Sequence, residues 1–295
     1  MRIATRSSRL AMAQARAVAD GLPGQAELVA ISTRGDRARR PLAAIGGKGL
    51  FTAELEAALR SGQVQLAVHS AKDLPADMPQ DMVIAAVPAR EDPRDALVTA
   101  SGATLNDLAG SARIGTSSLR RAWQLQWLRP GLRAEPIRGN LQTRLRKLRR
   151  GEYEALLLAL AGLKRLGLLE PLGPAVCPLP VEQFVPAAGQ GALAVQCLAA
   201  DAAARELASA VNDPESAAAL AAERGVVRGL GASCRSAVGV HVRREGGGWL
   251  ATGLVAAAEG RQVIRLSVPG PTAQAAGEAL LARLIEAGAG KLLSR

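Results

Sequence analysis

The sequence is poor in the residues from which several common protein sites are built. Of its 295 residues, three are cysteine, an odd number with no C-x-x-C pair, and two are histidine. A disulfide framework and a zinc site are therefore disfavoured, and we expect no metal site. Aromatic residues make up 2% of the chain, which leaves few platforms on which single-stranded nucleic acid could stack its bases. We expect no nucleic-acid partner.

Long apolar runs are also missing. No run of about 18 apolar residues without a charge occurs, so we expect no membrane span. The segment Met1–Arg6 leads directly into a strand-like stretch without the apolar core of a signal peptide, which predicts a cytoplasmic location. The formal net charge is +11, from 37 basic and 26 acidic residues. This surplus favours an acidic partner, whether nucleic acid, an anionic membrane or an anionic small molecule.

The hydrophobic pattern predicts an α/β protein with two lobes. Strand-like and helix-like segments alternate through the first ninety residues, and a second such series begins near Arg94. The similar segments 87–89 and 185–187, both Val-Pro-Ala, bracket the second series. We interpret them as paired crossings, so that the second lobe is inserted into the first and a ligand is enclosed between the two.

A different pattern follows from about Pro214. Three strand-like segments and a long amphipathic helix over 272–287 predict a third, small α+β domain, a three-stranded sheet covered by helices. The triple glycine 246–248 reads as a hairpin turn within that sheet. We predict domains at 1–91 plus 190–209, at 94–186, and at 214–295.

Two predicted strand-to-helix turns carry arginines. They lie in the segments 113–121 and 132–144. The N-terminus of a helix presents free backbone N–H groups and a partial positive charge. Added arginine forks would create a site for a multiply charged, planar anion such as a carboxylate or phosphate. The alternative is ordinary solvated surface charge.

Two further segments could carry chemistry. Asp73 follows an apolar strand, where an ionised carboxylate would suit stabilisation of a developing cation, although a turn or capping role is equally compatible. The glycine-rich segment 46–49 is compatible with a mobile lid carrying Lys48 and equally with an ordinary loop.

The cysteines and a few large residues divide into reactive and packed candidates. Cys234 lies in a loop of small residues beside Arg235, which would favour an accessible thiolate. We expect packed positions instead for Cys197 and His69. Trp123 and Trp127, four residues apart on one predicted helix, are also expected in the core rather than in a stacking site.

Nine stretches, in order along nearly the whole chain, resemble the porphobilinogen deaminase (hydroxymethylbilane synthase) family. They read RIATRSSRLA, STRGD, GGKGLFTAELE, AVHSAKDLP, REDPRDAL, IGTSSLRR, RGNLQTRL, AGLKRLGL and AAGQGALA, and a cysteine loop follows them. The resemblance implies two lobes like those of periplasmic binding proteins with a small third domain. It also implies a monomer that uses a dipyrromethane cofactor to join four porphobilinogen units head to tail. Ammonia is lost at each step, and water releases hydroxymethylbilane, for tetrapyrrole and haem synthesis.

The resemblance further implies residue roles. The cofactor would be held on Cys234 by a thioether, Asp73 would stabilise cationic intermediates, and Lys48 and Phe51 would belong to a lid loop. Residues that bind cofactor and substrate would be Arg6, Ser70, Lys72, Thr116, Ser118, Arg120, Arg121, Arg138, Arg144, Arg165 and Gln190. A two-lobed anion-binding protein without chemistry is the alternative, and it would need neither Cys234 nor Asp73.

Overall fold

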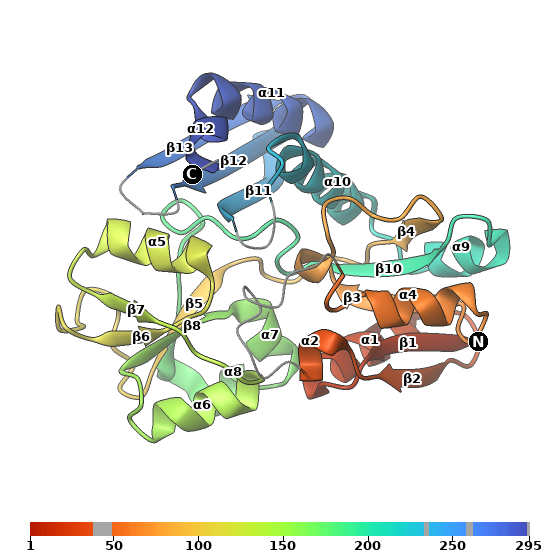
Figure 1. The fold of residues 1–295 in the computed structure, drawn as a ribbon, viewed down its shortest axis with the longest axis horizontal. Coiled ribbons are helices and arrows are strands. Elements are labelled where there is room, and N and C mark those ends of the chain that lie inside the picture. Colours follow the sequence, from red (N-terminus) through yellow and green to blue (C-terminus); the bar gives the residue numbers. More distant parts are fainter. Residues whose placement is uncertain (38–48, 233–235, 258–261, 294–295) are drawn as a thin grey trace. The chain divides into compact units, whose positions relative to one another are not determined.

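The computed structural model describes residues 1–37, 49–232, 236–257 and 262–293 (Figure 1). Contacts along the chain divide it into two compact units. The first unit comprises residues 1–91 and 192–221, and the second comprises residues 92–191 and 222–295. The chain therefore leaves the first unit after residue 91 and returns to it at residue 192.

The first unit is built on a five-stranded mixed sheet in the order β2-β1-β3-β10-β4. Neighbours β2, β1 and β3 run parallel, whereas β10 is antiparallel to both β3 and β4. The carboxyl ends of β1 and β3 therefore lie at the same edge of the sheet. The strands are β1 (Arg2–Arg6), β2 (Glu27–Ile31), β3 (Leu66–Ser70), β4 (Met82–Ala86) and β10 (Leu193–Leu198).

Helices cover both faces of this sheet because its strands are apolar on both sides. One apolar cluster joins Ile3 and Val68 to Val18 of α1 and to Ala204 of α9. A second cluster, on the other face, joins Ala4 and Ala67 to α4. The helices are α1 (Arg9–Gly21), α2 (Arg34–Arg37), α4 (Ala53–Arg60), the 3₁₀ turn η1 (Ala71–Asp73) and α9 (Ala202–Ser209). Helix α10 (Pro214–Gly229) contains the division between the units.

The second unit contains another five-stranded mixed sheet, in the order β7-β6-β8-β5-β9. Strands β7, β6 and β8 are parallel, and β5 is antiparallel to β8 and β9. Apolar clusters again lie on both faces, one including Leu145 of α6 and the other including Leu125 of α5. The strands are β5 (Asp95–Thr99), β6 (Arg113–Gly115), β7 (Arg133–Glu135), β8 (Ala155–Ala159) and β9 (Val176–Pro178). The helices are α5 (Leu119–Leu128), α6 (Leu141–Arg149), α7 (Leu160–Arg165), α8 (Leu169–Leu172) and η2 (Gly173–Ala175).

The same unit includes a separate antiparallel sheet of three strands, β11 (Ala237–Glu245), β12 (Gly248–Ala256) and β13 (Val263–Gly270). Helices α11 (Ala273–Glu286) and α12 (Ala289–Leu293) pack on it. Gly246 and Gly247 both have positive φ, +55° and +82°, and form a two-residue turn at the predicted hairpin. The predicted fold class is confirmed: two α/β lobes together with a small three-stranded sheet covered by helices. The predicted three-domain division stays a prediction, because the contacts group this sheet with the second lobe.

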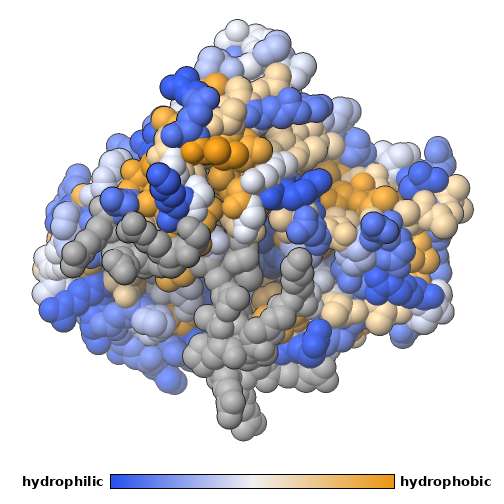
Figure 2. Space-filling view, turned by 45° about the horizontal axis from the view of Figure 1, so that its top comes forward, coloured by the Kyte–Doolittle hydropathy of each residue, from blue (hydrophilic) through white to orange (hydrophobic). Residues whose placement is uncertain are grey.

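The surface is mixed in polarity. Figure 2 shows hydrophilic residues spread widely over one face, with apolar residues gathered between them. None of the helices in the described part of the chain is long and apolar enough to cross a membrane. His69 and Cys197 are buried as predicted, but Trp127 is 50% exposed, so the prediction of a core position for it was wrong. Helix α5 is amphipathic, and Trp127 lies off the face that buries Gln124 and Leu125.

Candidate functional site

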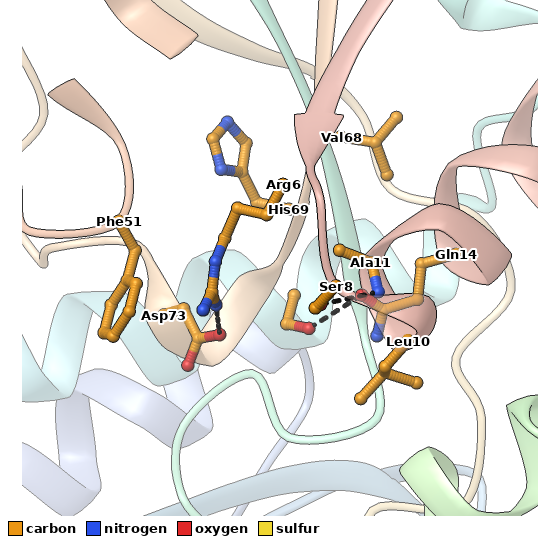
Figure 3. Close-up of a pocket in the computed structure, with 10 residues that line it drawn as sticks. Arg6, Ser8, Leu10, Ala11, Gln14, Phe51, Val68, His69 and Asp73 are labelled. Carbon is orange, nitrogen blue, oxygen red and sulfur yellow. Dashed lines mark hydrogen bonds and ion pairs between the residues drawn. The ribbon is translucent and has the colours of Figure 1, made fainter. Parts of the chain in front are cut away.

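A pocket lies at the carboxyl ends of β1 and β3 in the first unit, with a cavity of about 60 Å³ (Figure 3). Strand ends of this kind are where open α/β sheets bind ligands. Helix α1 begins beside it, capped by the Ser8 hydroxyl, which accepts the Ala11 N–H at 3.2 Å. The lining residues are Arg6, Ser8, Leu10, Ala11, Gln14, Phe51, Val68, His69, Ser70 and Asp73.

Arg6 and Asp73 face each other across this pocket (Figure 3). Nη1 of Arg6 lies 3.7 Å from Oδ2 of Asp73, and the Arg6 guanidinium carbon lies 4.1 Å from the centre of the Phe51 ring. A side chain at Gly35 would overlap that ring, so glycine at this position admits Phe51. The pocket therefore combines a cation, an exposed carboxylate and an aromatic wall.

Arg6 and Ser70 each have a hydrogen-bond partner that the sequence analysis did not single out, Asp36 and Gln14 respectively. Asp36 accepts hydrogen bonds from Arg6, including one from Nε at 3.2 Å, and the Thr33 hydroxyl donates to Asp36 at 2.8 Å. Burial by itself would raise the pKa of Asp36, but the hydrogen bonds from Arg6 and Thr33 lower it overall. Buried Gln14 accepts a hydrogen bond from the predicted site residue Ser70 at 3.0 Å. Asp36 was visible only as part of the matched STRGD stretch, and Gln14 gave no signal.

His69 lines the pocket as a neutral, packed residue. Its Nε2 lies 3.0 Å from Oε1 of Gln196, and only 5% of the residue is exposed. Burial lowers the pKa of His69 to about 4; the nearby Arg6 charge contributes in the same direction, and the Gln196 contact opposes it. A neutral imidazole at pH 7 cannot supply positive charge to an anionic ligand.

The second unit presents two helix N-termini at the ends of neighbouring parallel strands. After β6, the Ser118 hydroxyl caps α5 by accepting the Arg121 N–H at 3.5 Å, and Thr116 is buried in the same turn. After β7, Asn140 caps α6 by accepting the Thr143 N–H at 3.0 Å. The two arginine-bearing turns predicted from the sequence are therefore present and adjacent.

Two of the predicted arginines are buried around a carboxylate. Arg120 and Arg121 are 4% and 7% exposed, and both bind Asp95, which is fully buried. Nη1 of Arg120 and Nε of Arg121 each donate to Asp95 at 2.7 Å. Gln190 adds a hydrogen bond from Nε2 to Asp95 at 3.0 Å. Three predicted site residues thus meet one aspartate that the sequence prediction did not single out.

Arg138 and Arg144 lie closer to solvent. Arg138 is exposed, and Nε of Arg144 donates to the carbonyl of Gly139 at 2.9 Å. Burial lowers the pKa of Arg144, and the positive charges of Arg121 and Arg138 lower it further. Arg138 and Arg144 share the turn that contains Gly139, and Arg121 lies in the first turn of the helix that follows the neighbouring parallel strand. We call these three residues the arginine group.

The remaining predicted residues are placed as follows. Lys72 precedes Asp73 in η1. Arg165 ends α7 and donates to the carbonyl of Gly191 at 2.6 Å. Cys234 and Lys48 lie outside the described residues. The structure thus places Arg6, Phe51, Ser70 and Asp73 in the pocket of the first unit. Thr116, Ser118, Arg120, Arg121, Arg138 and Arg144 lie in the two arginine-bearing turns of the second unit. Lys72, Arg165 and Gln190 lie outside both.

Comparisons with known proteins show which family the chain resembles. Residues 1–206 match the family model described as "Porphobilinogen deaminase, dipyromethane cofactor binding domain". The porphobilinogen deaminase of Roseiflexus castenholzii is 46% identical, covering 99% of this chain and 98% of that protein. The corresponding protein of Methylobacillus flagellatus is 44% identical, covering 99% and 96%.

Among solved structures, a periplasmic binding protein of Salmonella typhimurium with high arginine specificity is similar at 15% identity and a TM-score of 0.40. The match covers 74% of this chain and 95% of that one. The family match and the curated relatives, which extend over almost the whole sequence, decide the assignment: the chain belongs to the porphobilinogen deaminase family.

Proposed function

We propose that this protein is a hydroxymethylbilane synthase. It joins four porphobilinogen molecules head to tail on a covalently bound dipyrromethane primer, releasing one ammonia for each unit, and water then frees the linear tetrapyrrole. The observation that carries the proposal is the pairing of Arg6 with Asp73 at a strand-end pocket, in a chain that matches the family over nearly its full length.

The arginine group fits a ligand with many carboxylates. Every pyrrole unit of such a chain carries an acetate and a propionate, and guanidinium forks bind carboxylates with paired hydrogen bonds. Within the described residues, neither Arg138 nor Arg144 has a carboxylate partner, and their mutual repulsion is reduced when an anion binds. Arg121, Arg138 and Arg144 would therefore hold the carboxylates of the dipyrromethane cofactor and of the growing chain.

The cofactor, when bound, supplies the nucleophilic pyrrole carbon to which each new unit is added. This chain's own part in the reaction belongs to Asp73 and Arg6. The Asp73 carboxylate accepts hydrogen bonds from pyrrole N–H groups and stabilises the positive charge that develops as ammonia departs. Arg6 binds a carboxylate of the incoming substrate, and its contacts with Asp36 and Phe51 fix its direction before the substrate arrives.

Other parts of the proposal follow from the family assignment. Cys234 carries the cofactor through a thioether, and Lys48 and Phe51 belong to a lid loop. Ser70, Lys72, Thr116, Ser118, Arg120, Arg165 and Gln190 bind or orient the ligand. The protein works as a cytoplasmic monomer without nucleic-acid or membrane partners. Light scattering on protein eluting from a size-exclusion column checks the monomeric state against the chain mass of 30.4 kDa.

Denaturing mass spectrometry tests the central proposal. Protein purified from cells that make porphobilinogen should exceed the polypeptide mass by one dipyrromethane unit, and Cys234→Ser should show the bare mass. Asp73→Asn should keep the adduct but lose about 100- to 1,000-fold in kcat, as expected when a preorganised electrostatic stabiliser is removed. A bare wild-type mass together with no turnover of porphobilinogen would instead point to a non-catalytic anion binder.

A further inference from the structure

Asp95 is a fully buried carboxylate with three partners on one side of the second unit's sheet. It is the first residue of β5. Its Oδ2 accepts from Nη1 of Arg120 at 2.7 Å, and its Oδ1 accepts from Nε of Arg121 at 2.7 Å and from Nε2 of Gln190 at 3.0 Å. Burial alone would raise the pKa of Asp95, but the neighbouring charges of Arg120 and Arg121 hold it far below its usual value. The residue is therefore a fixed negative charge at any physiological pH.

The two arginines that share Asp95 are both buried but have different further neighbours. Arg120 uses Nη1 also to bind the carbonyl of Val185 at 2.7 Å, and its guanidinium carbon lies 6.0 Å from the buried Phe184 ring. Arg120 is thus tied into the apolar core. Arg121, in contrast, is one of the two residues whose charge depresses the pKa of Arg144. Of the pair, Arg121 is the one that belongs to the arginine group.

Arg121 retains capacity for a ligand while it is held in place. Its hydrogen bonds run from Nε to Asp95, from Nη1 to the carbonyl of Leu157 at 2.9 Å, and from Nη2 to Gln190 at 3.5 Å. Nη2 also lies 2.7 Å from Oδ1 of Asp95. A guanidinium has five N–H donors, so these bonds fix its plane without using all of them. A planar fork fixed in advance loses little conformational freedom when it binds a carboxylate.

The charge balance is consistent with that role. Among the described residues, one carboxylate, Asp95, serves Arg120 and Arg121, while Arg138 and Arg144 have none. A buried structural ion pair would balance its charges. Here positive charge remains in excess at the edge where the strands end, and an incoming carboxylate would offset it.

These observations concern the ligand site, and the inference drawn from them rests on the proposed function. We propose that Asp95 is a positioning residue for carboxylate binding. Asp95 is itself held by hydrogen bonds from Arg120 and Gln190. It fixes the Arg121 guanidinium in the orientation that binds a carboxylate of the dipyrromethane cofactor or of the growing pyrrole chain.

Asp95→Asn tests this through the sign of the change in KM. If only net charge mattered, removing a negative charge would make the site more attractive to anionic porphobilinogen and lower KM. Positioning predicts the opposite: loss of adduct from folded protein, or KM raised about tenfold or more in the fraction that retains it, since small misplacements of a binding group are costly. Asp95→Glu, which restores the charge, should lie between wild type and Asp95→Asn.

Two further variants separate positioning from folding. Asp95→Asn combined with Arg120→Gln removes both charges of the core-facing pair, so folding should recover, monitored by circular dichroism, while cofactor loading and KM stay impaired. Glu154→Gln breaks a surface pair with Arg113 in the same unit and should leave KM unchanged. Wild-type KM and full adduct in Asp95→Asn, or full recovery in the double variant, would overturn the inference. An inactive, adduct-free wild type would instead overturn the proposed function.

Discussion

Burial without a charged partner distinguishes His69 from the other ionisable side chains around the first unit's pocket. Its one hydrogen-bond partner in the described structure is the neutral amide of Gln196. Arg6, by contrast, stands between two aspartates. The imidazole therefore stays neutral at pH 7, and only the guanidinium can offer a positive charge to a carboxylate. The same contrast gives His69 a measurable influence on stability.

Stability of the first unit should fall as the pH drops from 6.5 towards 4. Above pH 6.5, His69 is neutral whether the unit is folded or unfolded, so it adds no pH dependence. Between these pH values the unfolded chain takes up a proton that the folded unit, with a pKa of about 4, does not. The free energy of unfolding therefore decreases on acidification, by about 3 kcal/mol in total for a shift of this size.

Urea unfolding at pH 7.5 and at pH 4.5, followed by circular dichroism, measures this loss. His69→Gln keeps a hydrogen-bonding partner for Gln196 but cannot titrate, so it should lose less stability over the same interval. All other titrating groups are common to both proteins. Equal losses in the two would show that His69 does not titrate as described.

At the scale of elements, three helices bring backbone N–H groups to the candidate sites. Helices α1, α5 and α6 begin at the side-chain caps Ser8, Ser118 and Asn140, each directly after a strand. A cap satisfies one of the first N–H groups and leaves others available for an anion. The turn between β7 and α6 adds a constraint, since it must also place Arg138 and Arg144.

Gly139→Ala should disrupt this turn. Gly139 has φ +108°, and a Cβ there would lie 2.5 Å from Cγ2 of Thr143. A strained residue of this kind costs about 1–3 kcal/mol, and the Gly139 carbonyl also receives the Arg144 hydrogen bond. We expect lower stability together with a raised KM for porphobilinogen.

Gly110→Ala is the matched control, because nothing lies within 4 Å of a Cβ at that position. Its stability should change by less than about 0.5 kcal/mol. Thermal unfolding and steady-state kinetics compare the two variants. If they behave alike, the turn conformation does not matter for the arginine group.

At the scale of the whole molecule, the net charge of +11 is compatible with non-specific binding of polyanions or with one localised site that binds anions. The structure favours a localised site, because many surface arginines are already paired with carboxylates, including Arg60 with Asp81 and Arg113 with Glu154. Arg138 and Arg144 of the arginine group have no such partner among the described residues. Substrate affinity should then depend on salt more than turnover does.

KM for porphobilinogen should rise several-fold between 0.1 and 1 M potassium chloride, because the screening length falls from about 10 Å to about 3 Å. The chemical step, which follows binding of the charged substrate, should change less, so kcat should stay within about twofold. Sucrose at matched osmolarity controls for general solvent effects. A KM that ignores salt would argue against ionic recognition of the carboxylates.

Much of this architecture could be predicted from local pattern. The alternation of strands and helices in the two lobes was visible because apolar periodicity acts within a few positions of the chain. Trp127 was misplaced because its spacing from Trp123 gives a shared helix face but not whether that face is covered. Asp95 was passed over because an aspartate beside a strand has no local signature of burial.

The sequence by itself determined the α/β alternation, the two arginine-bearing turns and the family, since each depends on residue types at short, fixed spacings. Only the tertiary structure decided which charges meet: Asp36 and Asp73 at Arg6, and Asp95 between Arg120 and Arg121. Charges interact through space over a few ångströms, and the residues concerned are 25 to 67 positions apart in the chain. Strand pairing and helix packing, which bring such positions together, are fixed by the folded unit as a whole.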